Sequence, residues 1–286
     1  MLQARARITI RITGLCALVA LVVLPAGADP GAPLDAALAG AHREAANVAR
    51  DVYRHPKQTL EFFGLESNQT VVEIWPAAGW YTEILAPVLR EQGALYAATF
   101  VLSDKSGEYR RNIHNGFLAK LKARPELYDR VKLSGFDAGH TDIAPAGSAD
   151  LVLTFRNVHN WMKEGFVDEA FAAFYRSLKP GGALGVVEHR AKPGTSLEKM
   201  IESGYVTEEH VVALATKAGF TLEERSEINA NAADTAEHPR GVWTLPPAFA
   251  ACREVAPGPA QEECRKPYSD IGESDRMTLR FRKPAG

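Results

Sequence analysis

The chain of 286 residues is poor in cysteine, with Cys16, Cys252 and Cys264 as its three copies. No CxxC pair occurs, which argues against a redox motif and against a cysteine-ligated zinc site. Cys16 lies in the N-terminal apolar run, so the other two remain if that run is removed. In an oxidising compartment we expect them to form a disulfide, closing a short loop that has no helical or strand pattern. The alternative, a redox pair, is disfavoured by the wide spacing.

Several motifs of common enzyme classes are also absent. The eight histidines form neither HxH nor HExxH, so the sequence predicts no metal site. There is no GxSxG, and a serine hydrolase of the α/β type therefore lacks support. There is no GxGxxG, which disfavours a nicotinamide oxidoreductase.

The chain lacks an excess of positive charge. Its formal net charge is −2, and removing residues 1–28, with their three arginines, makes it −5. A mildly acidic protein has no general electrostatic attraction to nucleic acid, so we expect a small-molecule substrate instead. Beyond the N-terminus there is no apolar run long enough to span a membrane.

The N-terminal residues have the pattern of a targeting segment. Three arginines precede an apolar run of about 13 residues, and Ala26-Gly27-Ala28 follows. This pattern predicts a signal peptide over residues 1–28, cleaved before Asp29, and hence an exported, periplasmic protein. The alternative is an uncleaved membrane anchor, for which the run is short.

The remaining chain predicts a helical segment over residues 29–66 and an α/β domain over residues 67–286. Apolar runs alternate with amphipathic stretches, which indicates a mostly parallel sheet covered on both faces. Helices are expected at 34–53, 57–65, 80–93, 108–128, 164–178 and 207–220, and strands at 70–74, 94–100, 131–136, 149–155, 183–189, 221–228 and 277–284. A long irregular segment precedes the last strand, so we expect that strand to be antiparallel and near the sheet edge.

The first predicted strand ends in a candidate ligand-binding loop. It runs through Glu73 into WPAAGWYTE and then a helix. Ligands of open parallel sheets bind beyond the carboxyl ends of the strands, where helix N-termini offer free N–H groups. Gly79 permits a positive φ or a close approach of the backbone to a ligand. Glu73 either orients the loop and accepts from an ammonium group, or simply bonds loop amides.

The next two strand ends carry acids in less usual positions. A nucleoside-binding sheet normally has an acid at the end of its second strand, where this chain has Thr99-Phe100. Asp104, a few residues on, is either a displaced ribose ligand or a loop residue. Asp137 follows the third strand, where it could accept from an exocyclic amine or make a turn.

The fourth and fifth strands end in polar clusters. The fourth is followed by RNVHNW, in which His159 is either a general base, since its reference pKa is near neutrality, or a structural histidine. The fifth ends in Glu188, His189 and Arg190, which either bind a polar acceptor or form a solvated edge.

The order of these segments resembles a class I S-adenosylmethionine-dependent methyltransferase. The resemblance is carried by EIWPAAGWYTEILAPVL, FDA, SADLVLTFRNVHNWM and FYRSLKPGGALGVVEH, in that order. It is closest to exported or predicted methyltransferases that have a WP.gGWYTE loop and an IGESDRMTLRF ending. It extends from Val71 to the final strand.

The resemblance implies a Rossmann-like methyltransferase fold with seven strands, the last antiparallel, and S-adenosylmethionine as the cofactor. It implies that Glu73 and Gly79 lie against the methionine part of the cofactor. It also implies that Asp137 and Ala138 approach the adenine, and that Asn157 begins the loop beneath the sulfonium.

The chain departs from the family at the first loop. Two glycine positions of the acid-x-Gly-x-Gly-x-Gly pattern hold Trp75 and Ala77, and the ribose acid is missing from its usual place.

Two functions follow from these observations. The first is methyl transfer to an unidentified acceptor, with His159, Glu188 and His189 as candidate bases. The second is a non-catalytic exported protein that binds a nucleoside-like or other small ligand. The N-terminal helices, with Tyr53, Phe62 and Phe63, either form a lid over the site or pack against the domain without a role in the site.

Overall fold

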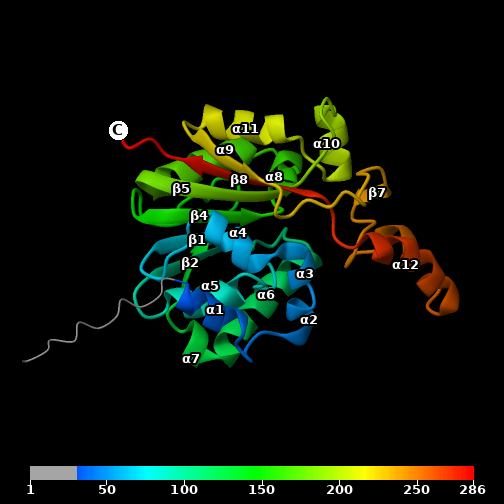
Figure 1. Ribbon diagram of the computed structural model, residues 1–286, viewed down its shortest axis with the longest axis horizontal. Helices are drawn as coiled ribbons and strands as arrows, with labels where there is room; N and C mark the ends of the chain where they lie inside the picture. The colour runs from blue at the N-terminus through cyan, green and yellow to red at the C-terminus, as the bar shows by residue number, and fades with distance from the viewer. Residues whose placement is uncertain (1–30) are drawn as a thin grey trace, which may run out of the picture.

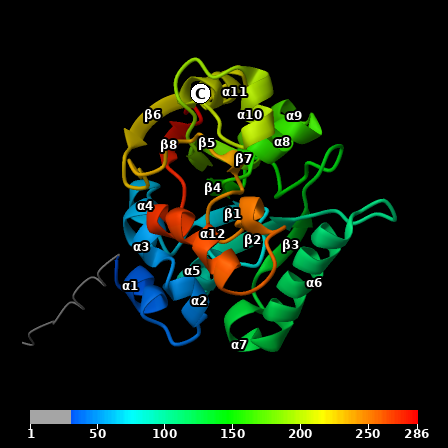
Figure 2. The same cartoon turned by 90° about the vertical axis from the view of Figure 1, so that its right-hand side faces the viewer.

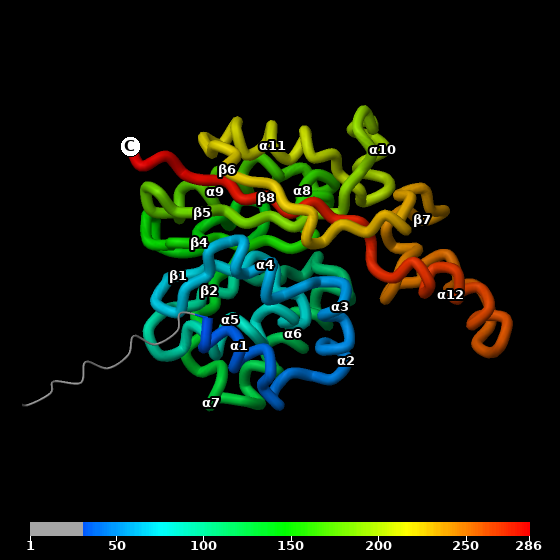
Figure 3. Tube along the Cα trace, in the orientation of Figure 1, coloured from blue at the N-terminus to red at the C-terminus, as the bar shows by residue number. Residues whose placement is uncertain are grey.

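A computed structural model describes residues 31–286 of the protein. The predicted signal peptide, residues 1–28, lies outside the described residues. The segment that follows it forms four short helices, α1 (Ala32–Leu38), α2 (Ala45–Val48), α3 (Asp51–Arg54) and α4 (Pro56–Phe62), which Figure 3 traces from dark blue to light blue. The single helix expected over 34–53 is therefore divided. Gly40 follows the end of α1, and His42 next to it is bonded through Nε2 to Glu83 O at 2.7 Å.

The central sheet has seven strands in the order β3-β2-β1-β4-β5-β8-β6. They are β1 (Thr70–Ile74), β2 (Ala94–Thr99), β3 (Lys132–Gly135), β4 (Ala149–Phe155), β5 (Leu178–His189), β6 (Thr221–Ser226) and β8 (Arg276–Arg282). The pairs among β1 to β5 are parallel, whereas β8 runs antiparallel to both of its neighbours, β5 and β6. The predicted fold class, with its antiparallel last strand, is confirmed.

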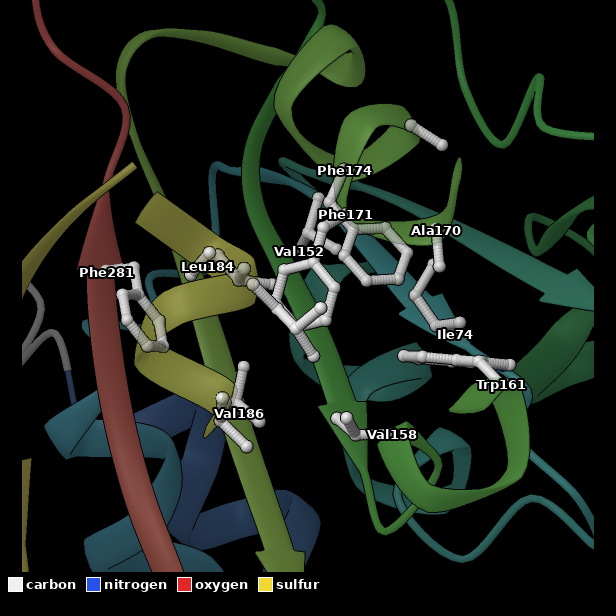
Figure 4. Close-up of a cluster of buried hydrophobic side chains, with 14 of the residues drawn as sticks. Ile74, Val152, Val158, Trp161, Ala170, Phe171, Phe174, Leu184, Val186 and Phe281 are labelled. Carbon is white, nitrogen blue, oxygen red and sulfur yellow. The ribbon is translucent and has the colours of Figure 1, made fainter. Parts of the chain in front are cut away.

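Alternate side chains of each central strand enter two different cores, as the pleat of a strand requires. Val152 of β4 belongs to a cluster with Trp161 and Phe174, part of which Figure 4 shows. Its neighbours Leu151 and Leu153 belong to a second cluster on the opposite face. Both faces of the sheet are thus covered by helices, which explains the near-continuous apolar runs of its strands.

The helices of the two faces come from different parts of the chain. One face is covered by α8 (Val158–Glu164), α9 (Val167–Ser177) and α11 (Glu208–Lys217), and the other by α1, α4 and α5 (Thr82–Leu89). The remaining helices are α6 (Glu108–Ala123), α7 (Pro125–Tyr128) and α10 (Leu197–Ser203). In Figure 1, α11 lies above the strands of the sheet, and α1, α5 and α6 lie below them. Among residues 31–286 there is no helix long and apolar enough to cross a membrane.

Two element predictions were wrong. β5 begins at Leu178, well before the predicted strand 183–189, and pairs with β4 across a register shift between Ala149 and Leu151. The segment before β8, expected to be irregular, contains β7 (Pro239–Val242), a short 3-10 helix (Ala250–Cys252) and α12 (Pro259–Ile271). None of the α12 side chains is buried, and Pro267 lies inside the helix, where proline is normally disfavoured, so no helix was expected there.

The predicted disulfide joins Cys252 to Cys264, with the two Cα atoms 5.9 Å apart. Cys264 lies inside α12, so the bond fastens this polar helix to the segment that follows β7. Figures 1 and 2 place α12 and β7 beyond one end of the sheet, the end at which the candidate site lies.

Candidate functional site

A cavity of about 1030 Å³ lies at the carboxyl ends of the parallel strands. This is the position where open α/β sheets bind their ligands. Figure 2 looks at this end of the molecule, with α12 in front. The residues that line the cavity follow β1, β2, β4 and β5, or come from the segments on either side of α12; they include Glu73, Trp75, Ala77, Phe100, Arg156, Asn157, His159, His189, Trp243, Pro246 and Ser274.

The loop after β1 has a glycine-like backbone although it holds one glycine. The φ angle is +46° at Trp75, +52° at Ala77 and +80° at Gly79. Positive φ is unfavourable for residues with a Cβ atom, and rare for a bulky one. The three positions at which the resemblance places glycines therefore keep the backbone conformation that favours glycine.

The Trp75 side chain fills space at the ends of β2 and β3. Its indole is buried, and Nε1 donates to Phe136 O at 2.8 Å. Its ring centroid lies 4.7 Å from that of Phe100 and 5.7 Å from that of Trp161. This indole thus forms an aromatic wall of the cavity on the side where the resemblance expects the adenine.

Arg110, from the first turn of α6, covers this wall. Its guanidinium carbon lies 5.0 Å from the Trp75 ring centroid, and Nη1 donates to Asp137 at 2.7 Å. Asp137 and Ala138 therefore lie beyond Arg110, where they line a second cavity of about 450 Å³ and not the large one. Asp104 is exposed in the turn between β2 and α6 and lines neither cavity.

Glu73 lines the large cavity with a buried carboxyl group. It accepts a hydrogen bond from Thr82 Oγ1 at 2.6 Å, and burial raises its pKa to about 7. Gly79 does not line the cavity: a Cβ atom added there would lie 3.1 Å from the Phe117 ring of α6. Asn157 ties β4 to β1, because its Nδ2 donates to Ile74 O at 3.1 Å.

His159 and Glu188 form a buried dyad at the cavity. His159 Nδ1 lies 2.9 Å from Glu188 Oε1. Glu188 also accepts from the backbone N–H of Val158 at 2.6 Å and of His189 at 2.8 Å. Because both Glu188 oxygens act as acceptors, Nδ1 carries the imidazole proton, which leaves the lone pair on Nε2.

His189 has a different environment, although its ring lies 5.3 Å from that of His159. Its Nδ1 is 2.5 Å from Ser274 Oγ. Burial lowers the pKa of His189 well below its usual value; a positive charge on His159, when that ring is protonated, and the charge of Arg156 lower it further. His189 is therefore neutral near pH 7.

The ligating atoms of His159, Glu188 and His189 lie within 4.8 Å of one another, a spacing that could hold a metal ion. Two histidines and a carboxylate are a common donor set for divalent metals. However, Glu188 Oε1 already accepts from His159 and from the His189 backbone, and Oε2 accepts from the Val158 backbone. The geometry favours a hydrogen-bonded acid–base pair.

The site combines predicted residues with others that sequence reasoning missed. Of the predicted set, Glu73, Trp75, Ala77, Asn157, His159 and His189 line the large cavity; Gly79, Asp104, Asp137, Ala138 and Glu188 do not. Arg54, Glu273 and Ser274 line it without having been predicted. Arg54 is the residue of the segment 31–66 that reaches the cavity, whereas Phe63 packs against the sheet beside Gly185.

The strand order, with β8 antiparallel between β5 and β6, is the Rossmann-like methyltransferase fold. No family profile and no curated protein matches the chain. Solved structures do match it, and S-adenosylmethionine-dependent methyltransferases of class I are prominent among them.

Two of these structures align with most of the chain. The [4+2]-cyclase SpnF has a TM-score of 0.55 at 19% identity, covering 90% of this chain and 93% of the cyclase. A protein from Galdieria sulphuraria, assigned as a sarcosine dimethylglycine methyltransferase, has a TM-score of 0.55 at 11% identity, covering 85% of this chain and 88% of that one.

A third structure contains a ligand of this class of enzymes. Phospholethanolamine N-methyltransferase 2 of Haemonchus contortus, in complex with phosphomonomethylethanolamine and S-adenosylhomocysteine, has a TM-score of 0.50 at 18% identity, covering 81% of this chain and 53% of that one. At these identities the comparison establishes the fold.

Proposed function

We propose that the protein is an S-adenosylmethionine-dependent methyltransferase that acts on a small molecule. The observation that carries this proposal is the buried His159–Glu188 dyad in the cavity at the strand ends of this fold. When bound, the cofactor supplies an electrophilic methyl group. The protein must then align the acceptor and remove its proton.

His159 is suited to take the proton from the acceptor. Its Nε2 carries the lone pair, and the Glu188 carboxyl group orients the ring and stabilises the charge that develops on it. Glu188 is therefore a positioning residue. His189, bonded to Ser274 and neutral, contributes a polar wall.

The cavity fits the cofactor best at its methionine end. Its volume of about 1030 Å³ is at the upper end of the range for small-molecule sites, which is enough for a cofactor and a small acceptor. Glu73 lines the part that the resemblance assigns to methionine, Asn157 lies where the resemblance places the loop beneath the sulfonium, and Ala77 lines the same cavity. At the other end, Trp75 and Phe100 would hold the adenosine by ring contacts, because Asp137 lies behind Arg110.

Arg110 also favours the second candidate, a protein that binds another small ligand without methyl transfer. Its Nη1 donates to the Asp137 carboxylate, the group that the resemblance assigns to the adenine, so this carboxylate is already hydrogen-bonded. The structural likeness to a protein named as a [4+2]-cyclase indicates that this fold accommodates other chemistry.

Titration calorimetry of the chain beginning at Asp29 tests the first candidate. We expect S-adenosylmethionine and S-adenosylhomocysteine to bind, and Ala77→Trp to abolish binding because Ala77 lines the cavity. Ala138→Trp is the matched control, since Ala138 lines only the second cavity and binding should change less than twofold. Circular dichroism establishes that both variants fold.

Absence of binding at millimolar cofactor would contradict the methyltransferase proposal. Loss of binding in both variants would instead contradict the placement of the adenosine against Trp75.

We also propose that the protein is exported to the periplasm. The basic and apolar pattern of residues 1–28 and the Cys252–Cys264 disulfide support this proposal, because disulfides persist in oxidising compartments. Intact-mass analysis of protein recovered from the cell envelope should give a chain that begins at Asp29. A chain that begins at Met1 would rule out cleavage.

A further inference from the structure

Four arginines surround one carboxylate in the wall of the large cavity. Arg50, Arg54 and Arg276 each bond to Glu273, at 2.6, 3.1 and 3.0 Å. The fourth, Arg156, follows β4 directly. Burial would raise the pKa of Glu273, but the charges of Arg54, Arg276, Arg156 and Arg50 lower it to about 2. Glu273 is therefore ionised, and the group carries three positive charges in excess.

Arg54 is buried and incompletely bonded. Its side chain is 2% exposed, and its Nε donates to both Glu273 oxygens. Its Nη2 is buried without a hydrogen-bond partner among the described residues. A buried N–H group without a partner is costly, and more so when the group is charged.

Arg156 supplies a second guanidinium at the same wall. Its backbone has a φ of +63°, and its guanidinium makes no ion pair or hydrogen bond with residues 31–286 in this structure. Burial lowers the pKa of Arg54 well below its usual value, and the nearby charge of Arg156 lowers it further. Both side chains line the cavity, beside His189 and Ser274.

The other acids around this wall are already engaged. Glu188 accepts from His159, and Asp275 pairs with Arg190 at 2.9 Å. Glu73 has a pKa of about 7, so near neutrality much of it is uncharged. Apart from Glu273, which Arg50, Arg54 and Arg276 share, these acids thus leave no carboxylate free to balance Arg54 and Arg156.

We propose that Arg54 and Arg156 form an anion subsite that binds a carboxylate or phosphate group of the ligand in the cavity. Guanidinium groups bind such oxyanions by paired, charge-assisted hydrogen bonds. An oxyanion there would give Arg54 Nη2 its missing acceptor and offset the excess charge. On the proposed function, this group belongs either to the methyl acceptor, held near His159, or to the methionine part of the cofactor.

Binding of inorganic phosphate and acetate at low ionic strength tests the subsite without cofactor. Calorimetry should detect binding of at least one of them, weakened at least tenfold by Arg156→Gln and partly restored by Arg156→Lys. Arg240→Gln, a change at an exposed arginine outside the large cavity, is the control and should alter binding less than twofold. Absence of binding by both anions, or equal binding by the wild type and Arg156→Gln, would overturn the subsite.

Two nucleosides then distinguish the source of the anion. S-adenosylhomocysteine carries the amino-acid carboxylate, and 5′-methylthioadenosine lacks it. If Arg156→Gln weakens the binding of S-adenosylhomocysteine but not that of 5′-methylthioadenosine, the subsite belongs to the cofactor. If the variant binds both nucleosides as the wild type does, the subsite belongs to the acceptor. If phosphate binding depends on Arg156 while neither nucleoside binds, the subsite stands and the methyltransferase proposal fails.

Discussion

Trp75→Ala is expected to lower the free energy of unfolding by about 3–5 kcal/mol, the usual cost of truncating a buried aromatic side chain. The indole is buried among Phe100, Phe136 and Trp161, and its Nε1 bonds to Phe136 O. Alanine would leave a cavity at the ends of β2 and β3 and an unpaired carbonyl. Urea unfolding followed by circular dichroism measures the change.

A second variant, Trp75→Gly, separates the effect of losing the indole on stability from the effect of the strained backbone. Both variants remove the indole, but at a φ of +46° alanine keeps a strained backbone and glycine does not. We therefore expect Trp75→Gly to be more stable than Trp75→Ala by about 0.5–1 kcal/mol. Trp243→Ala, at a half-buried tryptophan of the opposite wall, should cost less than either. A loss below about 1 kcal/mol in Trp75→Ala would contradict the structural role of the indole.

Glu73 should make the protein less stable as the pH rises through neutrality. Burial raises the pKa of its carboxyl group to about 7 in the folded chain, against an ordinary value of 4.5. Between these values the folded chain binds more protons than the unfolded chain, so the contribution is complete below about pH 4.5 and is lost as the pH rises through 7. The expected loss from this group is about 3 kcal/mol.

The test compares urea midpoints at pH 5 and pH 8 for the wild type and for Glu73→Gln. The amide stays neutral, so this part of the pH dependence should vanish in the variant. Glu91→Gln, at an exposed glutamate between α5 and β2, controls for the substitution itself. An unchanged pH dependence in Glu73→Gln would show that the carboxyl group ionises readily when buried.

Local patterns were sufficient to predict most of the sheet. β1 and β4 coincide with the predicted ranges 70–74 and 149–155, because a strand buried on both faces appears as a short apolar run. The antiparallel direction of β8 was predicted correctly from the absence of an expected crossover helix, although the segment before it contains α12. In contrast, α12 escaped prediction because it contains Pro267, a residue that normally disrupts the interior of a helix.

The candidate site was predictable only in part, because local patterns do not show which distant segments meet. Parallel strands end at one edge of a sheet, so polar residues after β4 and β5 could be expected to meet, and His159 does contact Glu188. No rule of this kind places Arg54 beside Glu273, which is 219 residues away in the sequence. Nor could the sequence indicate that Trp75 would turn its indole toward Phe136, since that depends on the space at the ends of β2 and β3.

The sequence by itself therefore determined where the strands of the sheet lie along the chain, the cysteine pair and the edge of the sheet at which a ligand would bind. These depend on hydrophobic period and on residues close together in the chain. The tertiary structure alone decided that Arg110 stands between Trp75 and Asp137, and that three arginines share Glu273 within the electrostatic reach of Arg156. Such contacts join elements far apart in the chain, and only packing brings their charges close enough to interact.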